Sequence, residues 1–100
     1  MSQADGPMRI ARKLRSIETA KTELVYQVAE VFRVIQSGNE REIAESLGGV
    51  VAIAYLLGQQ LGVDLAGIDR AARTTLPRAL GEDPDHAADF EHVQRYLSFK

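Results

Sequence analysis

The sequence predicts an all-α protein built on an antiparallel hairpin of two long helices. Apolar residues recur at alternating gaps of four and three through residues 8–37 and again through 43–61, which places them on one face of a helix. The sequence Ser37-Gly38-Asn39 between these segments has the composition of a turn. No segment shows the apolar–polar alternation of a strand.

The first segment is expected to form one long helix, because residues 8–37 contain neither Gly nor Pro. Its apolar stripe consists of Ile10, Leu14, Ile17, Leu24, Val28, Val31 and Ile35. Lys21 takes the one place in this series that is not apolar, and Val25 and Phe32 widen the stripe. Residues 1–7 are mostly polar and contain one Gly and one Pro, and we interpret them as a flexible tail.

The turn is expected to end the first helix and start the second. Gly38 is suited to the left-handed conformation that ends a helix, and Asn39 to the cap of the next one. The second stripe consists of Ile43, Leu47, Val50, Ala54, Leu57 and Leu61. Its middle, VVAIAYLL, is apolar on nearly all sides. One partner helix cannot cover such a helix, so it is expected at the centre of a bundle.

Two shorter helices are expected after the hairpin. Gly62 ends the second helix, and Asp64 is a suitable cap for a third helix that ends at Leu76, before Pro77. The expected organisation is a flexible tail (1–7), a helical core (8–76), a loop (77–84) and a C-terminal helix (85–100). The two long helices carry more apolar surface than one hairpin buries, so a homodimer or tetramer containing a four-helix bundle is expected.

Composition excludes several classes of function. The 100 residues carry a net charge of −2, which provides no electrostatic basis for binding nucleic acid. Because there is no cysteine, disulfides, thiolate metal sites and thiol nucleophiles are excluded. The first residues lack a signal-peptide core, and no apolar run is long enough to span a bilayer. We therefore expect a cytoplasmic protein with no membrane and no nucleic-acid partner.

Three glutamates are the candidate metal ligands. Glu23 and Glu30 lie seven residues apart, on one face of the first helix. Glu30 and Glu45 lie at similar distances from Gly38, so an antiparallel hairpin places them at similar height. Clustered carboxylates between helices are a typical site for Mg²⁺, which prefers oxygen ligands. The alternative is that these residues are solvent-facing helix formers.

Three segments between Val28 and Leu65 carry a family resemblance: AEVFRVI, EIAESLGGVV and LLGQQLGVDL. They resemble the MazG family of all-α nucleoside triphosphate (NTP) pyrophosphohydrolases, and the resemblance covers about residues 20–76. It implies a dimeric or tetrameric helical bundle. It also implies an ancestral reaction in which Mg²⁺ ions, held by clustered acids, help water to cleave an NTP between its α and β phosphates.

The resemblance further implies a degenerate metal-binding motif. The family's first acid pair, E-x-x-E, falls on Gln27 and Glu30, and its second pair, E-x-x-D, falls on Ser46 and Gly49. Only Glu30 keeps its carboxylate. Glu45 is one residue away from the motif, a rotation of about 100° around the helix. The loss of three ligands removes most of the negative charge that binds magnesium.

The favoured hypothesis is therefore a MazG-like bundle with impaired catalysis, which acts as a nucleotide-binding, regulatory or interaction module without an assigned cofactor. The alternative is an active NTP pyrophosphohydrolase whose Mg²⁺ is held by Glu23, Glu30 and Glu45 in a rearranged site. Neither hypothesis assigns a catalytic residue. Two weaker alternatives are a chorismate-mutase-like enzyme, because IETAKTELVYQVAE is similar to that family's first helix, and a structural adaptor bundle.

Overall fold

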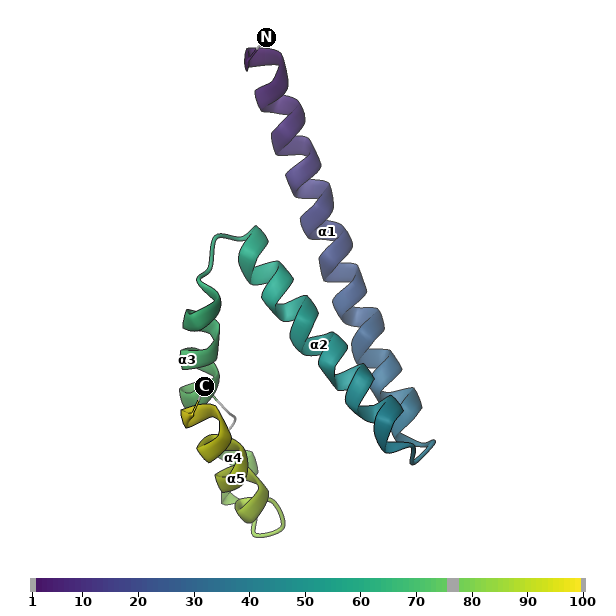
Figure 1. The fold of residues 1–100 in the computed structure, drawn as a ribbon, viewed down its shortest axis with the longest axis vertical. Coiled ribbons are helices and arrows are strands. Elements are labelled where there is room, and N and C mark those ends of the chain that lie inside the picture. The colour runs from purple at the N-terminus through teal and green to yellow at the C-terminus, as the bar shows by residue number, and fades with distance from the viewer. Residues whose placement is uncertain (1, 76–77, 100) are drawn as a thin grey trace. The chain divides into compact units, whose positions relative to one another are not determined.

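The computed structural model describes residues 2–75 and 78–99. Over these residues it contains helices and no strand, so the predicted all-α class is confirmed. The helices are α1 (Ser2–Ile35), α2 (Glu40–Gln60), α3 (Leu65–Thr75), α4 (Arg78–Glu82) and α5 (Ala87–Ser98) (Figure 1). They fall into two compact units, Met1–Gly62 and Val63–Lys100.

The first unit is the predicted antiparallel hairpin of α1 and α2 (Figure 1). Gly38 has a φ of 68°, the left-handed conformation that ends a helix at little cost only for glycine. The Asn39 side chain accepts a hydrogen bond of 3.0 Å from the backbone N–H of Glu42, one of the donors left without a partner at a helix start. The predicted chemistry of this turn is therefore confirmed.

The side of α1 that faces α2 differs in part from the predicted stripe. Ala20, Val31 and Val34 are buried, and Ile17 and Leu24 are partly buried. The predicted stripe shares Ile17, Leu24 and Val31 with this set, whereas Leu14, Val28 and Ile35 are exposed. The physical reason is that the apolar residues of α1 extend over a wider arc than one neighbouring helix can cover.

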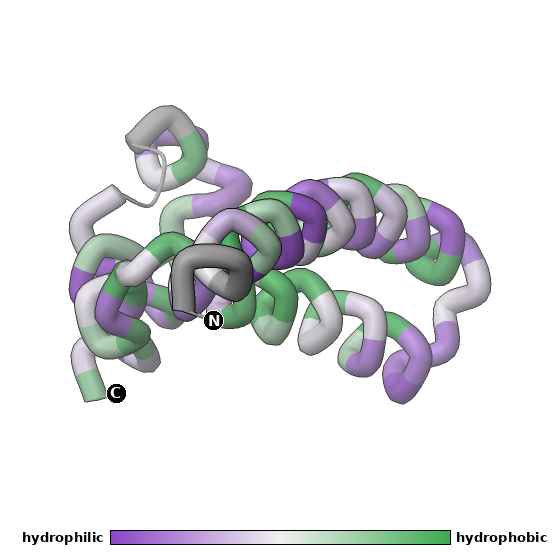
Figure 2. Tube along the Cα trace, turned by 90° about the horizontal axis from the view of Figure 1, so that it is seen from above, coloured by the Kyte–Doolittle hydropathy of each residue, from purple (hydrophilic) through white to green (hydrophobic). Residues whose placement is uncertain are grey.

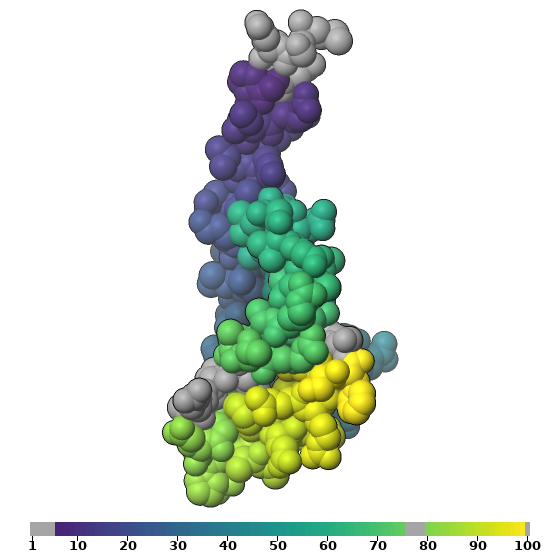
Figure 3. Space-filling model, turned by 90° about the vertical axis from the view of Figure 1, so that its left-hand side faces the viewer, coloured from purple at the N-terminus to yellow at the C-terminus, as the bar shows by residue number. Residues whose placement is uncertain are grey.

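α1 begins at Ser2, so residues 2–7 continue the helix and do not form the expected separate tail. Pro7 lies inside α1, in its second turn, where its missing N–H removes one helical hydrogen bond. At the far end of α2, Gln60 Nε2 donates a hydrogen bond of 2.6 Å to Ser16 Oγ. α1 continues for several turns beyond this contact, and its purple N-terminal part stands clear of α2 (Figure 3). We call residues 8–14 the overhang.

Hydropathy varies along both long helices, because polar residues interrupt the apolar ones at short intervals (Figure 2). Over the described ranges 2–75 and 78–99, no helix combines the length and apolarity needed to cross a bilayer. In the isolated chain Val51 and Leu56 of α2 are half exposed, so the hairpin alone leaves part of the apolar middle of α2 uncovered.

Among its described residues, 63–75 and 78–99, the second unit contains three short helices, one more than predicted. Gly62, which precedes it, has a φ of 77° and ends α2 as expected. α4 lies within 77–84, a segment expected to be a loop, because Arg78, Ala79 and Leu80 are good helix formers. A Cβ at Gly81 would lie 3.0 Å from the Phe90 ring, so α4 and α5 approach closely. α5 starts at Ala87, two residues later than expected, and the predicted helix end at Leu76 and Pro77 lies outside the described residues.

Candidate functional site

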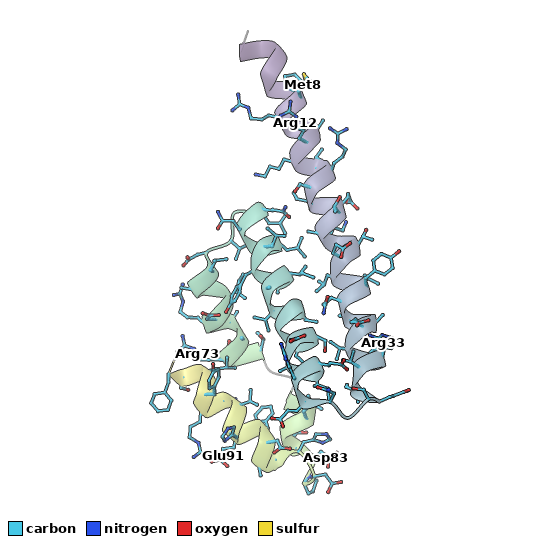
Figure 4. All side chains as sticks on the ribbon, turned by 45° about the vertical axis from the view of Figure 1, so that its right-hand side comes forward. Met8, Arg12, Arg33, Arg73, Asp83 and Glu91 are labelled. Atoms are coloured by element: carbon cyan, nitrogen blue, oxygen red, sulfur yellow. The ribbon has the colours of Figure 1, made fainter. Side chains whose placement is uncertain are left out.

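An open pocket of about 530 Å³ lies within the hairpin, near its turn. From α1 it is lined by Tyr26, Gln27, Glu30, Arg33 and Val34, and from α2 by Glu42, Glu45 and Ser46. Glu30 and Glu45 therefore line the same pocket, as their similar distances from Gly38 indicate. Arg33 marks this end of α1 in Figure 4.

Two of the pocket glutamates are engaged by arginines. Arg33 donates two hydrogen bonds to Glu30, of 2.9 and 2.6 Å, in the bidentate geometry that suits a guanidinium and a carboxylate. These hydrogen bonds lower the pKa of Glu30, because they stabilise the ionised carboxylate. Arg41 donates a hydrogen bond of 3.1 Å to Glu45. Both pairs lie within one helix, and neither reaches across the pocket.

Two further glutamates, Glu23 and Glu42, lie in places that differ from expectation. Glu23 does not line the pocket, although it lies on the same face of α1 as Glu30. Glu42 lines the pocket, although it is not one of the three candidate ligands chosen from the sequence. The sequence does contain a signal for Glu42: it precedes Glu45 by three residues, a spacing that puts both on one side of α2.

Gln27, Ser46 and Gly49 make a direct contact between the two helices beside the pocket. Gln27 Nε2 donates a hydrogen bond of 3.0 Å to the backbone oxygen of Ser46. A Cβ built on Gly49 would lie 2.6 Å from both Cδ and Nε2 of Gln27, so any larger residue there must displace the amide. Ser46 is only 3% exposed, and its hydroxyl donates to the backbone oxygen of Ile43. The Gln27 side chain thus fills the space that Gly49 leaves open.

The model of the MazG-like family matches the chain over residues 10–92. The chain belongs to the MazG-like family. The match extends beyond the segments that carry the resemblance and includes most of the second unit. No curated protein and no solved structure is significantly similar to the chain.

The donor set of this MazG-like chain does not fit the magnesium site that the resemblance implies. Within the part of the chain that the structure describes, no three His, Cys, Asp or Glu residues are grouped to hold a metal ion. Magnesium requires a near-octahedral set of oxygen ligands and loses its water reluctantly. Here Glu30 and Glu45, two of the three pocket carboxylates, are bound to arginines, and Gln27 donates its amide N–H to the backbone oxygen of Ser46.

Proposed function

We propose that this MazG-like protein is a catalytically impaired relative of the NTP pyrophosphohydrolases that acts as a nucleotide-binding, regulatory or interaction module. The observation that carries the proposal is the contact of Gln27 with Ser46 and Gly49. These three residues stand where the family resemblance places acids. Their side chains supply no carboxylate to a metal ion. The cytoplasmic location and the nucleotide ligand stay predictions.

Electrostatics supports the same proposal. A triphosphate carries several negative charges, and in a metal-dependent hydrolase the metal ions bridge it to the acidic residues of the protein. Without such ions, the carboxylates of Glu30, Glu42 and Glu45 repel phosphate groups, which supports the loss of catalysis and favours a regulatory or interaction role over nucleotide binding in this pocket. Arg33 does not offset this, because its guanidinium is already held by Glu30.

The test is pyrophosphate release from a panel of NTPs, with and without millimolar Mg²⁺, combined with calorimetry of Mg²⁺ and a non-hydrolysable NTP. We expect no release above the buffer rate and no magnesium-dependent heat. Release that depends on Mg²⁺ and is abolished by Glu30→Gln contradicts the proposal. Glu91→Gln, in the second unit, is the matched control for loss of one glutamate.

The alternative, an active Mg²⁺-dependent NTP pyrophosphohydrolase with a rearranged site, has one observation in its favour. Glu30, Glu42 and Glu45 line one pocket, with Glu42 taking the place expected for Glu23. In that case Arg33→Gln, which frees Glu30, is expected to tighten Mg²⁺ binding by about tenfold, on the order of one charged contact. Unchanged calorimetry of this variant counts against the alternative.

A further inference from the structure

The start of α1 extends past the end of α2, and a shallow pocket lies where the two helices part. Near the end of α2, Gln60 is hydrogen-bonded to Ser16. α1 begins at Ser2, so it rises about 20 Å beyond this contact. The shallow pocket has a volume of about 240 Å³ and is lined by Ile10, Lys13, Leu14, Ile17, Gln60 and Leu61.

The shallow pocket continues the side of α1 that packs against α2. The inward-facing residues of α1, which face α2 and are buried or partly buried, are Ile17, Ala20, Leu24, Gln27, Val31 and Val34. Their gaps alternate between three and four, and the same alternation, extended toward the N-terminus, reaches Lys13 and Ile10. Both residues line the shallow pocket. The overhang therefore offers another helix the same side that α2 covers further along.

The apolar residues of this pocket are uncovered. Ile10 and Leu14 are 64% and 59% exposed, and Leu61 at the end of α2 is 60% exposed. Gln60 Oε1 is buried and accepts no hydrogen bond from any described residue, although buried polar atoms nearly always have a partner. A binding partner that covers the apolar side chains and brings an N–H group to Gln60 would satisfy both.

The same segment is strongly basic. Its four exposed cations are Arg9, Arg12, Lys13 and Arg15, and residues 6–17 contain no acidic residue. None of the four forms an ion pair with a described side chain. Because the whole chain has a net charge of −2, this positive charge is a local feature. It indicates that the partner is acidic.

The two edges of the shallow pocket differ in chemistry. Arg9 and Arg12 precede Ile10 and Lys13, and one residue corresponds to a rotation of about 100°, so both arginines lie along one edge. Leu14 follows Lys13 and lies along the other edge. A partner therefore meets cations along one edge and apolar surface along the rest.

We propose that the overhang and the shallow pocket bind an amphipathic helix of a partner protein, with carboxylates along one edge of its apolar stripe. The helix lies against α1 in line with α2, its apolar side chains on Ile10 and Leu14 and its carboxylates beside Arg9 and Arg12. The opposite charges set its orientation and exclude helices with a basic edge. About 14 residues of helix match the length of α1 before Ser16.

Two other anionic partners fit these observations less well. A bilayer with anionic lipids also attracts a basic amphipathic helix, but a flat surface does not enter a hollow between two helices. Nucleic acid binds cations through its phosphates and leaves the apolar residues uncovered. Met8 and Arg12 mark the overhang in Figure 4, and Arg33 marks the opposite end of α1, near the glutamate pocket. The proposal therefore does not rest on the proposed function of that pocket.

Fluorescence anisotropy with a labelled peptide and the full chain tests the proposal. The probe is a hydrocarbon-stapled helix of about 14 residues, with leucines in one stripe and glutamates along one edge. The control peptide has lysines in place of the glutamates. We expect saturable binding of the acidic peptide with a dissociation constant of roughly 10 to 100 μM, and binding of the basic peptide at least about tenfold weaker.

Two pairs of variants locate the binding surface. Arg12→Glu is expected to weaken binding of the acidic peptide by about tenfold, whereas Arg95→Glu, the same change of charge at an exposed position of α5, stays within about twofold. Leu14→Ser is expected to weaken binding by about tenfold, whereas Leu56→Ser, at a position of α2 that is 48% exposed, stays within about twofold. Circular dichroism verifies that all four variants remain helical.

The proposal is overturned if the acidic peptide shows no saturable binding up to about 1 mM, or if the two peptides bind equally. Equal effects of a variant and its control place the binding surface elsewhere and also overturn it. Binding to phosphatidylglycerol vesicles that requires both Arg12 and Leu14 assigns the surface to a membrane instead. A doubled mass in sedimentation that Leu14→Ser reduces to one chain assigns it to a second copy.

Discussion

Glu45 and Leu47 are two residues apart in α2, yet they lie on opposite sides of the hairpin. Glu45 lines the pocket, on the side that carries Glu23, Glu30 and Glu42 and that we call the acidic face. Leu47 is 49% exposed on the other side, which carries Val25, Phe32, Ile35 and Val51 and which we call the apolar face. The same pairing of opposites occurs in α1, where Glu30 lies in the pocket and Phe32 is exposed on the apolar face. One layer of inward-facing residues separates the two faces. The inward-facing layer includes Gln27 and Ser46, which carry no carboxylate. The comparison therefore shows that the acidic residues stay on one side of the hairpin and do not enter the space between the helices.

The largest expected effect, on the free energy of unfolding, comes from placing a carboxylate among the inward-facing residues. Ser46→Glu places a carboxylate at a position that is 3% exposed, next to the amide of Gln27. We expect the free energy of unfolding to fall by about 3 kcal/mol, because a buried charge without a partner is costly. Urea unfolding at one fixed protein concentration measures the loss. Gln59→Glu, at an exposed position of the same helix, is expected to change stability by less than about 0.5 kcal/mol.

The next effect concerns how tightly the layer is packed. Gly49→Ala displaces the Gln27 amide and breaks its hydrogen bond to Ser46, which offsets the gain of about 1 kcal/mol that alanine brings to a helix interior. In a Gln27→Ala background the same change is expected to stabilise. A double-mutant cycle should therefore give a coupling of about 1 to 2 kcal/mol.

Gly48 supplies the matched control for that cycle. A Cβ at Gly48 meets nothing within 4 Å, so Gly48→Ala is expected to stabilise by about 1 kcal/mol with either residue at position 27. If the effect of Gly49→Ala is equally independent of Gln27, the contact between the helices is not formed in solution.

A comparison of two aromatic residues tests the difference between the faces directly. Phe32 and Tyr26 are 66% and 65% exposed, on the apolar and the acidic side respectively. If the chain forms the homodimer expected from its sequence through this side, Phe32→Ala weakens that dimer by about tenfold, because a ring buried in the interface is lost. Tyr26→Ala is expected to leave the dimer constant unchanged within about twofold. Analytical ultracentrifugation over a dilution series measures both, and the reverse order would exchange the roles of the two faces.

The smallest effect is a pH dependence on the acidic face. Arg33 lowers the pKa of Glu30 in the folded protein, so the pair contributes stability above the pKa that Glu30 has in the unfolded chain. This contribution is lost as the pH falls through the lowered folded pKa, and it is small because both groups are exposed. Carbon-detected NMR titration should show the pKa of Glu30 rising toward its ordinary value in Arg33→Gln, and not in Arg12→Gln.

Local chemistry made the turns of this fold predictable. Gly38, Asn39 and Gly62 act within a few residues of themselves, and all three take the predicted roles. The buried side of α1 was less predictable, because the apolar arc is wide and the sequence does not tell which part α2 covers; Ala20 and Val34 were missed for this reason. The short helix α4 carries no hydrophobic period long enough to recognise.

The candidate site was also predictable only in part. Hairpin geometry alone predicts that Glu30 and Glu45 lie at the same height, and both line the pocket. The contact of Gln27 with Gly49 depends on the distance between the helices, which no spacing within one helix determines. The arginine partners of Glu30 and Glu45 lie three and four residues away, so a search for ion pairs along each helix predicts them.

The overhang of α1 has a consequence for how the protein is observed in solution. Met8, Ile10 and Leu14 are exposed, and this segment meets α2 at its end, where Ile10 and Leu14 line a shallow pocket with Gln60 and Leu61. Helical turns with so little tertiary support fray in water, so their amide hydrogens should exchange with deuterium far faster than those between Ala20 and Val34. If exchange at residues 8–14 becomes slower as the protein concentration rises, another molecule covers this segment. Hydrogen exchange at these residues therefore measures association between molecules.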